Sequence, residues 1–335
     1  MTPTRLRVSR RRALTILGAA AGVALAPALM RAPKAAPLRT WQATALGAPA
    51  RIVLAHPDAA EAERLFQASA AEIARLEALF SLERADSALA RLNRDGALAA
   101  PAPDMVRLLD EAARVSRLSE GAFDVTVQPL WRLYAEHFAR HAQDRDGPDP
   151  AAIAAALALV DWRAVEVAPD RVAFARPGMA ATLNGIAQGV ITDRIAELLR
   201  ARGIGEVLVD LGEHRALGAH PDGRPWRVGL ADPFDPAHMA ATVELVDRAV
   251  ATSGGYGTPF SADGRHHHLF DPRTGASANH HASVTVVADT ATVADALSTA
   301  LYVAPPALAE RIAAAEPGLE VRITDAGGAL RTLGA

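Results

Sequence analysis

The 335 residues of the chain are enough for one large domain or two small ones, and because 50% of them are hydrophobic a substantial core can form. The net charge of −3 excludes a global positive field that would draw the chain to nucleic acid or to an anionic membrane. The absence of cysteine excludes disulfides, thiolate nucleophiles, thiolate zinc ligands and a lipid-modified cysteine anchor. Any catalysis must therefore use oxygen and nitrogen groups.

Residues 1–37 predict an export signal followed by a short linker. Twin arginines, Arg10 and Arg11, precede an apolar segment at 15–30 that is rich in alanine and glycine, and 26–28 offers cleavage points. This segment has 16 residues, fewer than the ~20 strongly apolar ones that span a membrane, so a cleaved signal is favoured over an anchor. A twin-arginine signal implies export of the folded protein. We therefore expect a periplasmic location, with loose membrane association if the signal stays uncleaved.

From residue 38 to residue 335, the bounds of the domain that the resemblance described below implies, the hydrophobic pattern predicts a mixture of helices and strands. Helices are expected at 59–80, 104–118, from 150 onward, and at 185–202, 292–303 and 306–315. Strands are expected at 123–130, 206–212, 226–230, 241–247, 282–288 and 319–324. The polar residues 135–149 predict a loop. Because helices and strands do not alternate strictly, as they do in parallel α/β folds, the pattern favours the α+β class.

A carboxylate and a hydroxyl lie four residues apart in the segment ADALSTAL, at Asp295 and Thr299. On a helix this spacing places both side chains on one face, one turn apart. Oxygen ligands of this kind suit a hard cation such as Mg²⁺, which takes one or two carboxylates and keeps positions for water and phosphate. The alternative is an exposed aspartate and a threonine whose hydroxyl bonds back to its own helix.

Histidine is concentrated near RHHHLFDPRTG, residues 265–275, where His266, His267, His268, His280 and His281 are five of the 11 histidines in the chain. One interpretation is a zinc centre, although no second set at helical spacing supports it. Another makes one histidine a general base near neutral pH, with Asp271 to orient it and Arg273 to hold phosphate. A polar surface hairpin is the third.

Two glycine-containing segments, 183–189 and 254–257, stand where a helix or strand is expected to begin. Backbone N–H groups at such positions can cradle phosphates, but each segment taken alone more often marks a turn.

Seven segments in one order resemble the ApbE-type FAD:protein FMN transferases, which move FMN from FAD onto a threonine or serine of a partner protein. The resemblance runs from about residue 40 to the end of the chain. The segments are DSALARLN (86–93), SEGAFDVTVQPL (119–130), LNGIAQGVITD (183–193), VDLG (209–212), ATSGGY (251–256), HHHLFDPRTG (266–275) and ADALSTAL (294–301). The resemblance implies an α+β, T-fold-related domain with a mixed or antiparallel sheet, packed helices and a smaller lobe, with FAD between them.

The resemblance also implies roles for individual residues. Asp295, Thr299 and the backbone carbonyl of Gly185 match the family's Mg²⁺ ligands. His268 matches the catalytic base, with Asp271 beside it in the HxxDP frame. The positions that correspond to FAD contacts are Leu46, Glu83, Ala122, Phe123, Asp124, Thr182, Gln188, Leu269 and Arg273. The chain departs from the family's usual residue at Leu46, Glu83, Thr182, Gln188 and Gly255.

The implied activity is Mg²⁺-dependent transfer of FMN to a Thr or Ser hydroxyl, with release of AMP. FAD is the substrate, and the implied partner is an acceptor flavoprotein with a periplasmic flavin-binding domain, with no role for nucleic acid. Similarity to the subgroup that accompanies nitrous oxide reductase maturation suggests a membrane-bound electron-transfer protein as the acceptor. Two alternatives stay open: a Mg²⁺-dependent FAD pyrophosphatase that gives FMN and AMP, and a non-catalytic periplasmic flavin carrier.

Overall fold

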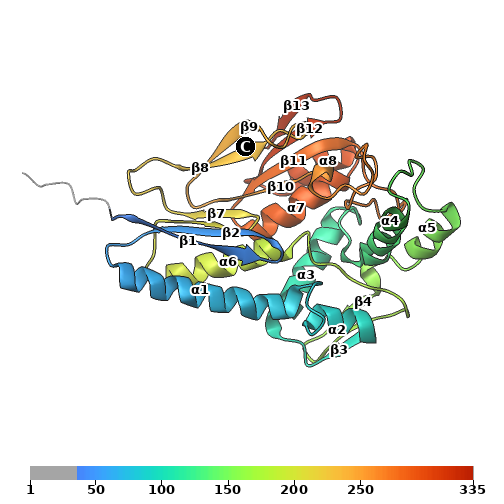
Figure 1. Ribbon diagram of the computed structural model, residues 1–335, viewed down its shortest axis with the longest axis horizontal. Helices are drawn as coiled ribbons and strands as arrows, with labels where there is room; N and C mark the ends of the chain where they lie inside the picture. The colour runs from blue at the N-terminus through green and yellow to red at the C-terminus, as the bar shows by residue number, and fades with distance from the viewer. Residues whose placement is uncertain (1–35, 335) are drawn as a thin grey trace, which may run out of the picture. The chain divides into compact units, whose positions relative to one another are not determined.

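An antiparallel sheet of eight strands forms the centre of the structure, a computed structural model that describes residues 36–334 (Figure 1). The strand order is β1-β2-β6-β7-β10-β11-β12-β13. The strands are β1 (Leu38–Ala45), β2 (Ala48–Ala55), β6 (Val207–Asp210), β7 (His214–Leu217), β10 (Ala249–Ser253), β11 (His281–Ala288), β12 (Glu320–Asp325) and β13 (Leu330–Leu333). The predicted export signal lies outside the described residues, apart from the end of its linker. In the part that is described, no helix is long and apolar enough to cross a membrane.

The two faces of this sheet are covered differently, as the alternation of side chains along β2 shows. Ile52 and Leu54 point into the large core formed with the helices, whereas Val53 belongs to a separate cluster with Trp226 and Val228. The helical layer consists of α1 (Ala59–Phe80), α6 (Ala187–Ala201) and α7 (Ala291–Val303), with α8 (Pro306–Ala315) packed on α7. The opposite face carries a two-stranded hairpin, β8 (Trp226–Ala231) and β9 (Met239–Leu245).

The remaining elements lie beside this core (Figure 1). One group is a small antiparallel sheet with two helices, and a second is a helical pair built around Tyr134 and Phe138. The bounds are α2 (Ala88–Asp95), β3 (Ala97–Ala99), α3 (Pro103–Leu118), α4 (Gln128–Arg140), α5 (Pro150–Leu157), β4 (Val165–Val167) and β5 (Arg171–Phe174). The predicted α+β class is confirmed.

The strand predicted at 123–130 is wrong. Residues Val125–Val127 form one turn of 3₁₀-helix, and α4 begins immediately after it at Gln128. The carboxylate of Asp124 accepts hydrogen bonds from the N–H and the hydroxyl of Thr126, which turns the chain into a helix. Pro129 stands in the first turn of α4, where its missing N–H costs nothing. The predicted loop at 135–149 consequently begins only after Arg140.

Close packing between α6 and α7 fixes the helix that carries Asp295 and Thr299. Gly189, in the first turn of α6, lies against the backbone of Ala291 and Thr292, so closely that a Cβ there would overlap the carbonyl of Ala291. The N–H of Gly189 also donates to Oδ2 of Asp295 at 2.9 Å. Glycine is therefore required at this position for the two helices to approach.

We predict that Gly189→Ala destabilises the protein by about 1–3 kcal/mol, since the new methyl group must push α6 away from α7. Urea denaturation of the purified variant measures the loss. Gly205→Ala is the matched control, because nothing lies within 4 Å of a Cβ built at Gly205. Equal stability of the two variants would contradict this account of the helix contact.

Candidate active site

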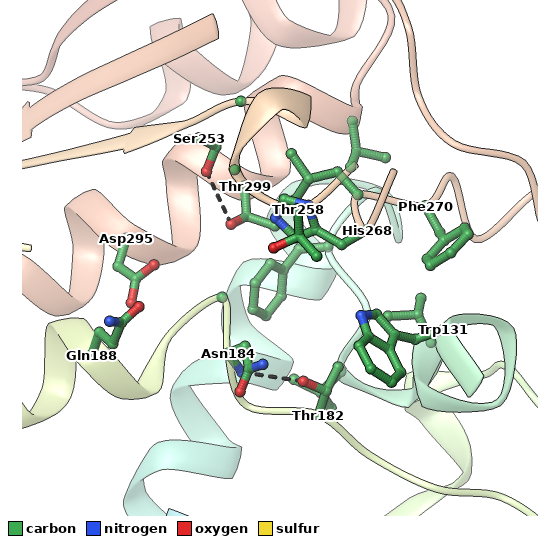
Figure 2. Close-up of a pocket in the computed structure, with 18 of the residues that line it drawn as sticks. Trp131, Thr182, Asn184, Gln188, Ser253, Thr258, His268, Phe270, Asp295 and Thr299 are labelled. Atoms are coloured by element: carbon green, nitrogen blue, oxygen red, sulfur yellow. Dashed lines mark hydrogen bonds between the residues drawn. The ribbon is translucent and has the colours of Figure 1, made fainter. Parts of the chain in front are cut away.

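A cavity of about 340 Å³ opens where several loops meet the side of α7 (Figure 2). Its lining includes residues of α7, of the segment that leads into α6, of the loop after β10, of the histidine segment, of α4 and the residues before it, and of the β1–β2 and β6–β7 turns. These segments are far apart in the sequence. The lining includes most of the predicted site residues, namely Leu46, Ala122, Phe123, Asp124, Thr182, Gly185, Gln188, His268, Leu269, Asp295 and Thr299.

The predicted cation ligands lie together in this cavity. Asp295 and Thr299 lie one turn apart on α7, as their spacing predicts, and Figure 2 shows both on the side that faces the cavity. Gly185 lies against Thr299, since a Cβ at Gly185 would stand 3.1 Å from Thr299 Oγ1. Ser253, at the end of β10, places its hydroxyl 3.3 Å from the same oxygen. Oxygen atoms therefore predominate in this corner, which suits a hard cation.

The electrostatics of this corner also favour a cation. Burial raises the pKa of Asp295 to about 7. Burial, followed by the negative charges of Asp295 and Asp210, raises the pKa of Glu213 well above its ordinary range. Among residues 36–334, neither lysine nor arginine lines the cavity. Buried carboxyl groups without a basic partner need either protons or a metal ion, so the residues present fit the Mg²⁺ that the resemblance implies.

His268 is the one histidine of the RHHH segment that lines the cavity (Figure 2). Its backbone N–H donates to the carbonyl of Thr258 at 3.2 Å, which anchors the segment beside the loop that follows β10. Burial lowers the pKa of the His268 ring, and its Nδ1 has no hydrogen-bond partner among the described residues. The ring is consequently neutral at pH 7 and able to accept a proton.

The predicted role of Asp271 in orienting His268 is wrong. Both oxygens of Asp271 accept from the guanidinium of Arg273, each at 2.8 Å, because the tight DPRTG turn folds Arg273 back onto it. Neither residue lines the cavity. Arg273 borders a separate hollow together with Arg163 and Arg176, so the structure does not bring it to the predicted phosphate.

The other histidines take structural positions, and the zinc interpretation finds no support. His266 lies near the carbonyl of Arg145, with Nε2 at 3.2 Å, and His267 is buried. Nε2 of His281 is 3.2 Å from the carbonyl of Ala304. Among the residues that the structure describes, no group of three or more His, Cys, Asp or Glu side chains could hold a metal ion.

Among the predicted FAD contacts, Glu83 does not reach the cavity. It follows the end of α1, where its N–H donates to the hydroxyl of Ser81 in a turn. Asp124 does line the cavity, but its carboxylate already accepts hydrogen bonds from Thr126 and from the N–H of Trp162. The bond from Trp162 is 3.0 Å long. The contact roles of the other predicted positions stay predictions.

The residues that line the cavity without having been predicted as site residues include Trp131, Glu213, Tyr256 and Phe270. Trp131 lies on α4, between the strand predicted at 123–130 and the loop predicted at 135–149, where the sequence pattern predicts no element. Tyr256 and Phe270 lie inside segments that we singled out, but their aromatic rings gave no separate signal. Glu213 directly follows the VDLG segment, and a carboxylate beside that glycine could have drawn attention to it.

Comparison with known proteins decides the family. The sequence profile of the ApbE family matches residues 46–323. The chain belongs to the ApbE family.

Two relatives with known functions are similar to this chain over most of its length. The FAD:protein FMN transferase of Haemophilus influenzae is 31% identical over 254 residues, which are 73% of each chain. The FAD:protein FMN transferase of Treponema pallidum is 37% identical over 248 residues, 68% of this chain and 67% of the relative.

Solved structures agree with this assignment. The flavin transferase ApbE from Vibrio cholerae superposes with a TM-score of 0.76 at 27% identity, covering 88% of this chain and 97% of the other. The apo form of the Pseudomonas stutzeri flavinyl transferase ApbE superposes with a TM-score of 0.74 at 30% identity, covering 89% of this chain and 96% of the other. The resemblance inferred from the seven segments is therefore confirmed, and the chain belongs to a family of transferases.

We predict that the buried His267 makes this ApbE-family protein lose stability as the pH falls from 6.5 toward 4. Burial lowers the pKa of His267 to about 4, against 6.5 when the chain is unfolded. Between these values the unfolded chain binds a proton that the folded protein does not, which costs up to about 1.4 kcal/mol for each pH unit. Well above pH 6.5, the His267 ring is neutral in both states and the cost vanishes.

Urea denaturation between pH 5 and pH 7.5 measures this slope, in a range where ordinary carboxyl groups stay ionised. His267→Gln should reduce the slope of the free energy of unfolding against pH by the contribution of one proton, because glutamine does not titrate. An unchanged slope in the variant would show that His267 is not the group responsible.

Proposed function

We propose that this chain transfers FMN from FAD to a threonine or serine hydroxyl of a partner flavoprotein and releases AMP, in a reaction that requires Mg²⁺. The observation that carries the proposal is one cavity in which the neutral ring of His268 and the oxygen-rich corner around Asp295 and Thr299 lie together without any lysine or arginine. The transferase names of the relatives support the same reaction.

Asp295, Thr299 and the backbone carbonyl of Gly185 are the groups that would hold Mg²⁺. When bound, the ion would neutralise negative charge on the FAD pyrophosphate, which no basic side chain in the cavity can do. The protein's own contribution is to hold these oxygens in place. The N–H of Gly189 fixes one oxygen of Asp295 at 2.9 Å, and Ser253 lies 3.3 Å from Thr299 Oγ1.

His268 serves as the general base for the incoming hydroxyl. The acceptor oxygen forms a bond to the FMN phosphorus, the bond from that phosphorus to the AMP oxygen breaks, and the hydroxyl proton passes to the His268 ring. A ring that is neutral at pH 7 is suited to this task, because burial lowers its pKa. The aromatic side chains of Trp131, Phe123 and Phe270 offer apolar surface for the flavin within the same cavity.

We further propose that the reaction takes place in the periplasm, on an acceptor with a periplasmic flavin-binding domain such as a membrane-bound electron-transfer protein. The twin arginines at Arg10 and Arg11 support the location. Two other functions would use the same cavity: hydrolysis of FAD to FMN and AMP, and storage of FAD without chemistry.

Incubation of the protein with FAD, Mg²⁺ and a purified flavin-binding domain should add the mass of FMN to that domain and release one AMP for each FMN attached. Mass spectrometry of the domain and chromatography of the nucleotides measure the two products. Free FMN with AMP would instead identify a pyrophosphatase, and tight FAD binding without AMP would identify a carrier. Addition of EDTA should stop the transfer.

His268→Ala should lower the rate of transfer by about 10²–10⁴, the usual contribution of a general base, while FAD binding stays within a few-fold of wild type. The rate of the wild-type protein should be level at neutral pH and fall below pH 6.5, because protonation of His268 removes the base. His266→Ala is the matched control, since His266 does not line the cavity. A His268→Ala protein that flavinylates at the normal rate would exclude His268 as the base.

A further inference from the structure

Glu213 is a buried carboxyl group that the proposed reaction does not use. It stands in the turn between β6 and β7, lines the cavity and is 9% exposed. Its backbone carbonyl accepts the N–H of Leu211 at 3.1 Å, so the turn holds the residue firmly. Its side-chain atom Oε2 is fully buried and has no hydrogen-bond partner among the described residues.

The groups around Glu213 do not compensate its charge. The charged groups that act on it are the carboxylates of Asp295 and Asp210, and both are negative. Arg215, two residues further along, is committed to Asp193 at 2.5 Å. The amide of Gln188 donates to the carbonyl of Leu211 at 3.2 Å.

A buried carboxylate that lies close to a second one is costly unless a proton or a cation neutralises it. Glu213 and Asp295 line the same cavity from different elements, the β6–β7 turn and α7, and the charge of Asp295 acts on Glu213. Glutamate and aspartate oxygens are the ligands that divalent hard cations prefer. The unpartnered Oε2 of Glu213 therefore has the chemistry of a cation ligand.

We propose that Glu213 is a further ligand of the divalent cation in this cavity, so that the ion is held by two carboxylates, those of Asp295 and Glu213. This inference rests on the proposed function, in which Asp295 and Thr299 hold such an ion. Two negative ligands bind the ion before the substrate arrives. The loaded cavity then presents a cation to the pyrophosphate of FAD.

Titration of Mn²⁺ into the FAD-free protein, followed by the EPR signal of the unbound ion, tests the proposal. Wild type should bind Mn²⁺ without FAD, and Glu213→Gln should weaken that binding at least tenfold. Asp210→Asn is the matched control: it removes a neighbouring carboxylate that does not line the cavity, and it should change the affinity less than threefold. Glu213→Ala should behave like Glu213→Gln, which keeps the test valid if one variant folds poorly.

A thermal melt gives a second readout that a merely structural role would not produce. Without divalent cations, Glu213→Gln should melt at the same temperature as wild type or higher, because it removes an uncompensated buried acid. With saturating Mg²⁺, wild type should gain stability, and the variant should gain less.

Two outcomes would overturn the proposal: no Mn²⁺ binding by the FAD-free wild type, or wild-type Mn²⁺ affinity in Glu213→Gln. Wild-type Mn²⁺ affinity with weakened FAD binding would mean that Glu213 is protonated and donates to the substrate. Asp295→Asn distinguishes this failure from that of the proposed function. If Asp295→Asn binds Mn²⁺ with wild-type affinity, the cation site of the proposed function is itself wrong. If Asp295→Asn loses Mn²⁺ binding while Glu213→Gln keeps it, only the role of Glu213 as a ligand is wrong.

Discussion

The carboxylate of Asp193 joins the elements on which the cavity depends. It lies on α6, is buried, and accepts hydrogen bonds from the backbone N–H groups of Ala291 and Thr292 at 2.8 and 2.9 Å. A negative charge at this point also favours the N-terminus of α7, where the helix dipole is positive. Arg215 on β7 forms an ion pair with the same carboxylate at 2.5 Å. One buried ion pair therefore sets α7 against both α6 and the sheet.

This arrangement matters because α7 carries Asp295 and Thr299. The close contact at Gly189 and the hydrogen bond from its N–H to Asp295 fix the rotation of α7 relative to α6. The β6–β7 turn that presents Glu213 leads directly into the strand that carries Arg215. The carboxylate and hydroxyl of α7 and an acidic group from the β6–β7 turn consequently meet in one cavity, with their positions set by packing that lies outside it.

No lysine or arginine of the part of the chain that the structure describes lines the cavity, whereas acidic and hydroxyl side chains do. Phosphate recognition in many proteins relies on fixed basic side chains. In the proposed reaction, a cation held by the acidic and hydroxyl oxygens of this cavity would supply the positive charge instead. The neutral His268 is consistent with this, since an uncharged ring can take a proton from a hydroxyl. The charged DPRTG turn close by is separate from this chemistry, because Arg273 is occupied by Asp271.

The sequence by itself determined the α+β class, the helices at 59–80, 292–303 and 306–315, the family, and the pairing of Asp295 with Thr299, because helical periodicity and motif order are local properties. It misassigned 123–130, since the alternation of Phe123, Val125 and Val127 imitates a strand while the hydrogen bonds of Asp124 turn the chain into a helix. Only the tertiary structure decided that Asp271 accepts hydrogen bonds from Arg273, that Glu83 lies outside the cavity and that Glu213 lines it. These outcomes depend on contacts between residues brought together by packing or by one specific turn, which spacing along the chain does not encode.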